Sequence, residues 1–170
     1  MSTLSSVYRS PIGSILIEST DEFITALLFM DEKKEAMAKD KLGIETGTND
    51  NLIDKCRKQL NEYFEGTRRE FDFPIQQSGT AFQQKIWAGL LQIPYGKTIS
   101  YLDLSKRTGD AKAIRAVGTT NGKNQLSIVV PCHRVIGSNG DLTGYAGGLW
   151  RKKWLLEHEG KFANGVQTLF

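Results

Sequence analysis

The chain has 170 residues, which is enough for one ordinary domain or two small ones but not for a larger assembly of domains. Its composition, with 39% hydrophobic and 24% charged residues, is that of a folded protein and excludes a disordered or fibrous one. Two cysteines are too few for a disulfide framework and, with only two histidines, argue against a structural zinc site.

The hydropathy of the chain gives no indication of a membrane protein. No apolar run approaches the roughly 18 residues that a membrane-spanning helix needs. The first ten residues lack the charged start and apolar stretch of a signal peptide. We therefore expect a cytoplasmic protein that has no membrane partner.

The net charge of +3 is unevenly distributed along the chain. Residues 1–75 carry a net charge of −4 and residues 76–170 carry +7, so the basic surplus belongs to the second half. Such asymmetry favours a polyanionic partner for the C-terminal part, although an uneven surface without a partner fits the charge equally well.

The first half has the pattern of a small α+β unit. Residues 7–10 and 12–18 flank a turn, and residues 24–29 form a third β-rich run, which together predict an antiparallel meander. A helix is expected from Asn51, with apolar residues at helical spacing up to a stop at Gly66.

Two further features complete the first half. Cys56 falls on the apolar stripe of the expected helix, so we interpret it as a core thiol without chemistry. Residues 71–74 resemble a last short strand, and the polar residues 76–79 mark the domain boundary.

Helices dominate the second half. Phe82, Ile86, Leu90 and Leu91 mark an amphipathic helix that ends before Pro94. A capping-box pattern at 100–103 begins a short helix that runs to about Thr108, and Asp110 can cap another over 111–120. Two short helices joined by a glycine-containing turn form a helix-turn-helix.

The second helix of this pair has two kinds of surface. Ala113, Ile114 and Val117 can face the core or pack closely, while Lys112 and Arg115 point elsewhere. The arrangement suits a DNA-docking helix. Helix pairs of this kind are common, so their spacing alone does not decide between DNA binding and simple packing.

The remaining segments complete a winged-helix pattern. Residues 128–130 have the composition of a buried strand that leads into 131–135, and a polar, glycine-rich loop follows over 137–148. A final helix then passes through Trp150, Trp154, Leu155 and His158 and is closed by Gly160.

A thiol and an imidazole stand next to each other at Cys132 and His133. Adjacent residues on an extended chain point to opposite sides, so the pair by itself also fits a buried thiol beside a surface histidine. Pro131 fixes the backbone before the thiol, and the glycine-rich loop leaves room for a ligand. A thiol needs a base at neutral pH, which His133 could supply directly or through water with Glu159 as its orienting acid.

The motifs around this thiol resemble those of the O6-alkylguanine-DNA alkyltransferases, also called methylated-DNA–protein-cysteine methyltransferases. The similarity covers nearly all of residues 78–160 and is looser over 1–75. It is carried by the following segments in order: 94–101 (PYGKTISY), 113–118 (AIRAVG), 131–135 (PCHRV), 144–149 (GYAGGL) and 154–160 (WLLEHEG).

The resemblance implies a fold and an activity. The fold is α+β, with a ribonuclease-H-like N-terminal domain over 1–75 and a winged helix-turn-helix domain over 76–170. The activity is the direct, irreversible transfer of a methyl or other alkyl group from O6 of guanine, and less so from O4 of thymine, to Cys132. It implies double-stranded DNA containing O6-alkylguanine as the partner, no cofactor, and a monomer that acts once.

The resemblance also implies roles for individual residues. His133 corresponds to the base that acts through water, Glu159 to the acid that orients it, and Asn124 to the residue that bridges the helix-turn-helix to the active-site strand. Arg115 corresponds to the arginine finger and Tyr101 to a tyrosine that contacts the flipped base. A base must leave the duplex to react, and a flat guanidinium can fill the gap that it leaves.

Further residues follow from the same similarity. The tyrosine and serine hydroxyls at Tyr101 and Ser138 could supply a proton to the departing guanine. The expected base pocket consists of Val135, Ser138, Tyr145 and Ala146. Apart from the similarity, the positive charges of the second half are expected to contact phosphates, with Ala113 as a further DNA contact: Lys97, Lys106, Lys112, Lys123 and Arg151.

The chain departs from the family at the hinge, where Gln125 replaces a frequent proline. Some relatives hold zinc in the N-terminal domain, but residues 1–75 contain no histidine and one cysteine, so we predict no metal. Two alternatives differ from alkyl transfer. One is a non-catalytic, alkyltransferase-like module that binds damage, whose relatives have tryptophan where this chain has Cys132. The other is a Cys-His-Glu hydrolase.

Overall fold

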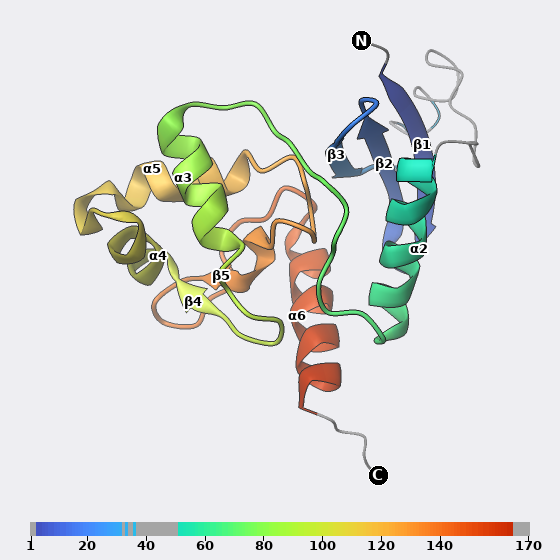
Figure 1. Cartoon of the computed structure of the whole chain (residues 1–170). Coiled ribbons are helices and arrows are strands. Elements are labelled where there is room, and N and C mark those ends of the chain that lie inside the picture. The colour runs from blue at the N-terminus through green and yellow to red at the C-terminus, as the bar shows by residue number, and fades with distance from the viewer. Residues whose placement is uncertain (1–2, 32, 34–35, 37–50, 165–170) are drawn as a thin grey trace. The chain divides into compact units, whose positions relative to one another are not determined.

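A computed structural model of the chain describes residues 3–31, 33, 36 and 51–164 (Figure 1). The chain divides into two compact units. The first comprises residues 1–77 together with 125–127, and the second comprises 78–124 and 128–170. Each unit has its own helices and strands, which gives the α+β composition that the sequence predicts.

The first unit is built on an antiparallel meander, as predicted. β1 (Leu4–Ser10), β2 (Gly13–Ser19) and β3 (Ile24–Phe29) lie in that order in the sheet. Ile15 and Ile17 of β2 are fully buried. Ser14 and Leu16, which alternate with them on the other face, are also at most 9% exposed, so β2 is covered on both faces.

α2 (Asn51–Glu65) packs against this sheet and ends before Gly66, as predicted. Gly66 has φ +87°, a conformation that favours glycine and stops the helix. Cys56 is fully buried on the apolar stripe, and burial raises the pKa of its thiol to about 12. This thiol is therefore protonated at neutral pH and has the environment of a core residue.

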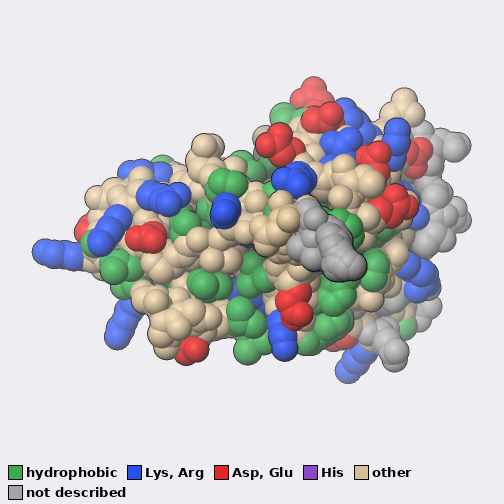
Figure 2. All heavy atoms as spheres, turned by 90° about the horizontal axis from the view of Figure 1, so that it is seen from below, with side chains coloured by type: hydrophobic (Ala, Val, Ile, Leu, Met, Phe, Trp, Pro, Cys, Tyr) green, Lys and Arg blue, Asp and Glu red, His purple; other side chains and the backbone are tan. Residues whose placement is uncertain are grey.

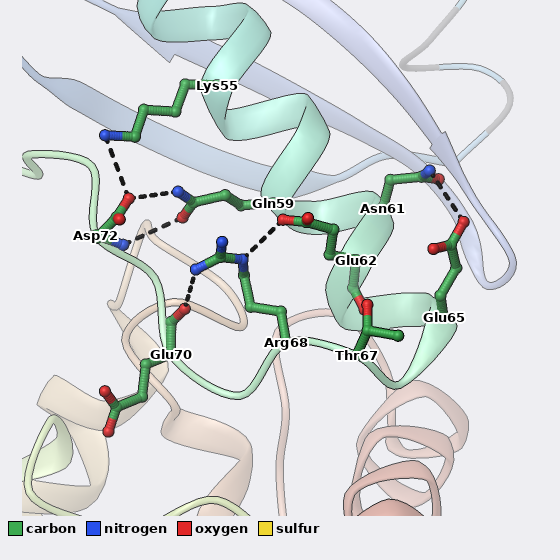
Figure 3. Close-up of polar contacts among 9 residues, drawn as sticks. All are labelled: Lys55, Gln59, Asn61, Glu62, Glu65, Thr67, Arg68, Glu70 and Asp72. Atoms are coloured by element: carbon green, nitrogen blue, oxygen red, sulfur yellow. Dashed lines mark hydrogen bonds and ion pairs between the residues drawn. The ribbon is translucent and has the colours of Figure 1, made fainter.

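Polar side chains fasten the segment after α2 to the helix (Figure 3). Arg68 Nε lies 2.9 Å from Glu62 Oε1, and Lys55 Nζ lies 3.2 Å from Asp72 Oδ1. The Gln59 amide donates to Asp72 and accepts from the Asp72 backbone N–H. These bonds replace a strand ladder for this part of the backbone.

The strand expected over 71–74 is therefore wrong. Among the described residues, the pairing near this stretch is an isolated parallel bridge between Ile24 and Ile75. Ile24 N donates to Pro74 O, and Gln76 N donates to Ile24 O. Pro74 has no backbone N–H, and the backbone N–H of Asp72 donates to the Gln59 side chain. A regular ladder of strand hydrogen bonds therefore cannot form here.

The second unit begins with α3 (Ala81–Leu90). Thr80 and Gln83 form a reciprocal capping box at its start. The helix buries Ile86, Trp87 and Leu90, while Phe82 and Leu91, which the sequence analysis assigned to its apolar stripe, are 40% and 48% exposed. The stripe prediction was wrong for those two residues: Phe82 lies in the first turn of α3, and Leu91 is the C-cap residue beyond its last turn.

The helix-turn-helix is confirmed. β4 (Ile99–Ser100) leads into α4 (Tyr101–Thr108), where the Ser100 hydroxyl accepts from Asp103 N. The turn at Gly109 is followed by the 3-10 turn η1 (Ala111–Ala113) and by α5 (Ile114–Gly122). Asp110 caps η1 by accepting from Lys112 N at 2.8 Å, while α5, whose N-cap is Ala113, has no side-chain cap.

The two surfaces of α5 differ partly from the prediction. Val117 is fully buried, and Lys112 and Arg115 are exposed, as expected. Ile114, in contrast, is 38% exposed and lies at the edge of a cavity described below, so it was wrongly assigned to the core.

Residues 128–130 are buried, but they do not form the predicted strand. Ile128 has φ +73°, which bends the chain out of an extended path. The Val130 carbonyl accepts from Asn124 Nδ2 at 2.8 Å and from Cys132 N at 2.8 Å. These local bonds therefore occupy the Val130 carbonyl, which in a strand would accept a hydrogen bond from a neighbouring strand.

The last elements complete the second unit. The 3-10 turn η2 (Cys132–Arg134) is followed by β5 (Val135–Ile136), which pairs in parallel with β4. α6 (Leu149–Ala163) passes through Gly160, which therefore does not close the helix as expected. No helix in the described ranges combines the length and apolar character that crossing a bilayer requires.

Candidate active site

Cys132 is the first residue of η2 and is 6% exposed. Its backbone is held on both sides, because Cys132 N donates to Val130 O and Asn121 Nδ2 donates to Cys132 O at 3.3 Å. Burial raises the pKa of the Cys132 thiol, and a hydrogen bond with the Asn124 side chain and the charge of Lys152 act in the opposite direction. The thiol is positioned firmly but needs help to lose its proton.

His133 and Glu159 form a buried pair next to this thiol. His133 Nε2 lies 2.7 Å from Glu159 Oε2, and the two side chains are 0% and 1% exposed. His133 and Arg134, through their charges and hydrogen bonds, hold the pKa of Glu159 far below its usual range despite burial, so its carboxylate is ionised and accepts hydrogen bonds only. Nε2 must then carry a proton, and a neutral His133 ring has its lone pair on Nδ1.

His133 Nδ1 is the free end of this pair. It is buried, and none of the described side chains or backbone groups forms a hydrogen bond with it. An imidazole whose Nε2–H is bound to a carboxylate and whose Nδ1 is unoccupied is arranged to accept a proton. The predicted association of His133 with Glu159 is therefore present as geometry, while their catalytic roles stay predictions.

A cavity of about 480 Å³ opens beside Cys132. Its walls come from α4, α5 and the loop before α6, and they include Tyr101, Arg115, Tyr145 and Ala146. The Thr143 hydroxyl donates to Tyr101 Oη at 3.1 Å, which ties the loop to α4. The structure thus brings together one thiol and four predicted site residues around a space that can hold a small planar ligand.

The other predicted residues lie outside the lining of this cavity. Val135 is fully buried in β5, and Ser138 is exposed on the following turn. Lys112 and Lys123 are exposed at the two ends of the second helix, and Ala113 is half-buried. Their assignments to the base pocket and to DNA contacts stay predictions.

Asn124 makes the bridge that the sequence analysis assigned to it, although the partner segment is a turn and not a strand. Its Nδ2 donates to Val130 O, which links the end of α5 to the residues before Cys132. The Gln125 N–H is bound by the Gln77 side chain at 3.0 Å, a bond that a proline at this position could not form.

Three site residues escaped the sequence analysis. Arg134 donates to both oxygens of Glu159, at 2.8 Å and 3.0 Å, and to Ile93 O at 2.7 Å. Asn121 binds the Cys132 carbonyl and lines the cavity, and Lys152 is fully buried near it. Arg134 directly follows the Cys-His pair, and this placement was the available signal; for Asn121 and Lys152 the sequence offers only polar residues at helical spacing from buried ones.

Basic side chains are exposed on the second unit, which contains the cavity. Figure 2 shows Lys and Arg side chains projecting into solvent at the end of the molecule where Figure 1 draws α4. Arg115, Lys112 and Lys123 are exposed on or beside α5. Among the described residues, no group of three or more His, Cys, Asp or Glu side chains could hold a metal ion.

A helix-turn-helix unit that carries a buried thiol, a His-Glu pair and a cavity with an arginine at its edge defines a class of DNA-directed proteins with a cysteine nucleophile. Comparisons with known proteins identify the family. The model described as "6-O-methylguanine DNA methyltransferase, DNA binding domain" matches residues 81–161, and the corresponding "ribonuclease-like domain" matches residues 4–77. The chain belongs to the 6-O-methylguanine DNA methyltransferase family.

Similar proteins carry the same description. The chain is 43% identical over 154 residues to the methylated-DNA–protein-cysteine methyltransferase of Methanosarcina acetivorans, covering 91% of this chain and 96% of that one. It is 44% identical to the constitutive enzyme of Bacillus subtilis, with 82% and 84% covered. The crystal structure of Mycobacterium tuberculosis OGT in complex with DNA superposes with a TM-score of 0.81 at 39% identity and 93% coverage of both chains.

Proposed function

We propose that the protein repairs DNA by transferring an alkyl group from O6 of guanine, and less so from O4 of thymine, to Cys132, once per molecule. Membership of the family supports the reaction class. The observation that carries the assignment to Cys132 is its position at a cavity beside the buried His133–Glu159 pair. Cys56, the other thiol, is fully buried in the first unit.

The proposed reaction needs a proton acceptor and a proton donor. Cys132 Sγ loses its proton through a water molecule to His133 Nδ1, and the ionised Glu159 stabilises the resulting imidazolium. The sulfur then forms a bond to the alkyl carbon while the bond from that carbon to O6 breaks. The bonding electrons stay with guanine, which takes up a proton from Tyr101 or Ser138 and remains in the DNA as a neutral, unmodified base.

Double-stranded DNA is the proposed partner of the second unit. The reactive thiol is 6% exposed and a base inside a duplex is not accessible to it, so the damaged nucleotide must rotate into the cavity. Arg115 borders the cavity from an exposed position on α5, which suits insertion into the gap that the base leaves. A DNA complex of a relative of similar fold supports this partner.

Stoichiometry tests the proposal. Increasing amounts of duplex oligonucleotide containing O6-methylguanine are incubated with a fixed amount of protein, and the repaired guanine is counted. We expect repair to stop at one lesion per molecule, and Cys132→Ala to repair none. Tight binding without repair would instead identify a damage-binding module, and many lesions per molecule would identify a hydrolase.

Three further expectations accompany this function. The protein acts as a monomer without a cofactor or metal and resides in the cytoplasm. Sedimentation of the protein alone and on a single-lesion duplex tests the monomer, since one molecule per short duplex is expected and a stable pair would contradict it.

A further inference from the structure

Lys152 is a buried cation near the thiol that has no part in the proposed reaction. Lys152 on α6 is 0% exposed, whereas its neighbour Lys153 is exposed. Its ammonium group donates to Val135 O at 2.7 Å and to Gly144 O at 3.3 Å. A buried lysine is costly unless its donors are bound, so its place in a small core requires an explanation.

These two bonds join opposite parts of the site. Val135 directly follows η2, which carries the thiol, and Gly144 precedes Tyr145 and Ala146, which line the cavity. The same ammonium group lies 5.9 Å from the centre of the Tyr101 ring. Lys152 thus contacts the thiol segment, the loop and α4 at once.

The charge of Lys152 is not neutralised locally. In the described part of the chain, no carboxylate lies within ion-pair distance of it, and Glu159, further along the same helix, is already bound by His133 and Arg134. Burial lowers the pKa of Lys152 to about 8, while its attraction to Cys132 acts to raise that pKa. The two backbone carbonyls that accept hydrogen bonds from Lys152 Nζ favour its charged form.

The other charged groups near the thiol differ from Lys152. Arg115 borders the cavity from an exposed position, Arg134 is balanced by Glu159, and Arg151 donates to Gly147 O beside the Trp150 ring. The hydrogen bond with Asn124 and the charge on Lys152 favour the thiolate of Cys132, against the burial that disfavours it. Both influences are independent of DNA.

We propose that Lys152 is a positioning residue of the alkyl-transfer site: its ammonium group pins the cavity loop at Gly144 to the backbone of Val135 and stabilises the Cys132 thiolate. The proposal rests on the proposed function for its biological meaning. The effect on the thiol itself can be measured without any nucleic acid, so the two can fail separately.

The first test titrates the thiol. The rate of Cys132 alkylation by iodoacetamide is followed against pH by peptide mass spectrometry in the wild type, in Lys152→Met and in the exposed control Lys153→Met. Removing the charge is expected to lower the thiolate fraction at pH 7, where Lys152 can be charged, about tenfold, which corresponds to about one pKa unit. Because a more basic thiolate is more nucleophilic, the net rate falls about threefold.

Two more variants separate charge from packing. Lys152→Gln retains a hydrogen-bond donor without the charge and repeats the test if Lys152→Met does not fold, as judged by its thermal melt. Lys152→Arg retains the charge. A lower alkylation rate at pH 7 in the Met or Gln variant, together with a rate at least as high as that of the wild type in the Arg variant, supports the proposal. An unchanged rate at pH 7 in the neutral variants, or an equal loss in all three, overturns it.

The second test uses the DNA reaction. Lys152 is fully buried and cannot contact a phosphate, so Lys152→Met should lower the limiting rate of single-turnover methyl transfer and leave the Kd for lesion-containing duplex unchanged. A change in Kd alone would contradict a positioning role. If the wild type transfers no methyl group, the proposed function fails, and the thiol titration still decides the role of Lys152.

Discussion

Glu159 binds two neighbours at once, the imidazole of His133 and the guanidinium of Arg134. The three side chains are at most 8% exposed, and the carboxylate accepts from Nε2 of the histidine and from Nε and Nη2 of the arginine. This arrangement fixes the ring orientation that leaves Nδ1 free. Glu159 also neutralises the charge of Arg134, and a buried cation without such a partner would strongly destabilise the protein.

Replacing the acid therefore has a predictable cost. Glu159→Gln should lower the free energy of unfolding by about 3–5 kcal/mol, because it leaves the Arg134 charge buried without its partner. Urea denaturation at pH 7 measures the change. Glu157→Gln, at an exposed position of the same helix, is the matched control and should change stability little. An equally small loss in both variants would contradict the importance of the buried pair.

The same residue predicts the acid dependence of stability. The pKa of Glu159 is lowered in the folded protein, so its stabilising contribution is fully present above the pKa of an unfolded glutamate, about 4.3, and is lost as the pH falls below that value. We expect the stability difference between the wild type and Glu159→Gln to narrow between pH 5 and pH 3, values set by the same reference pKa of about 4.3. A difference that stays constant over this range would contradict the assignment.

Arg115 gives a prediction that separates base flipping from chemistry. Arg115→Ala should slow methyl transfer from duplex DNA by at least about tenfold, since filling the gap offsets a cost of a few kcal/mol, and should leave the reaction with the free base O6-benzylguanine unchanged. Single-turnover assays with both substrates make the comparison. Arg107→Ala, an exposed arginine on α4 that does not line the cavity, is the control. Equal slowing of both substrates would assign Arg115 to the chemistry instead.

Local rules predicted many elements correctly and failed where tertiary contacts decide. The helix start at Ser100 and the cap at Asp110 follow from side chains that bind nearby backbone N–H groups, so the sequence alone locates them. The apolar run 128–130 carried the composition of a strand, but a side chain from outside the run, Asn124, takes the Val130 carbonyl. Composition cannot reveal that competition.

The candidate site shows the same division. The motif around Cys132 pointed to the thiol, the base and the acid, because these residues lie in short, distinctive segments. The bond from Arg134 to Glu159 joins residues 25 positions apart, and the bonds of Lys152 reach backbone carbonyls that carry no sequence signal. Such contacts become visible only when η2, the cavity loop and α6 are assembled.

Alanine substitutions at two glycines of the second unit should change the stability of the protein in opposite directions. A Cβ at Gly96, where φ is +80°, would lie 2.4 Å from the Cβ of Ala163 near the end of α6, so Gly96→Ala should destabilise the protein by about 1–3 kcal/mol. Gly160 lies inside α6 with nothing within 4 Å of an added Cβ. Gly160→Ala should therefore stabilise it by about 0.5–1 kcal/mol. Thermal melts of both variants check the signs, and a destabilised Gly160→Ala would contradict the continuous helix.

For the whole molecule, the charge asymmetry predicts how DNA affinity depends on salt. The +7 of residues 76–170 implies counterion release on binding, so log K should fall linearly with log salt concentration. Lys112→Gln should reduce the slope by about one, because one phosphate contact is lost. Fluorescence anisotropy gives the slopes. Lys58→Gln on α2 of the first unit is the control, and an equal reduction in both variants would contradict a footprint confined to the second unit.

The central claim is that one damaged base gives its alkyl group to one thiol, and peptide mass spectrometry tests it most directly. The protein is incubated with duplex containing O6-methylguanine, digested, and both cysteine peptides are analysed. We expect one added methyl group on the peptide with Cys132 and none on the peptide with Cys56, while the lesion becomes guanine. Natively folded protein with an unmodified Cys132 after repair, or with the methyl group on another residue, would contradict it.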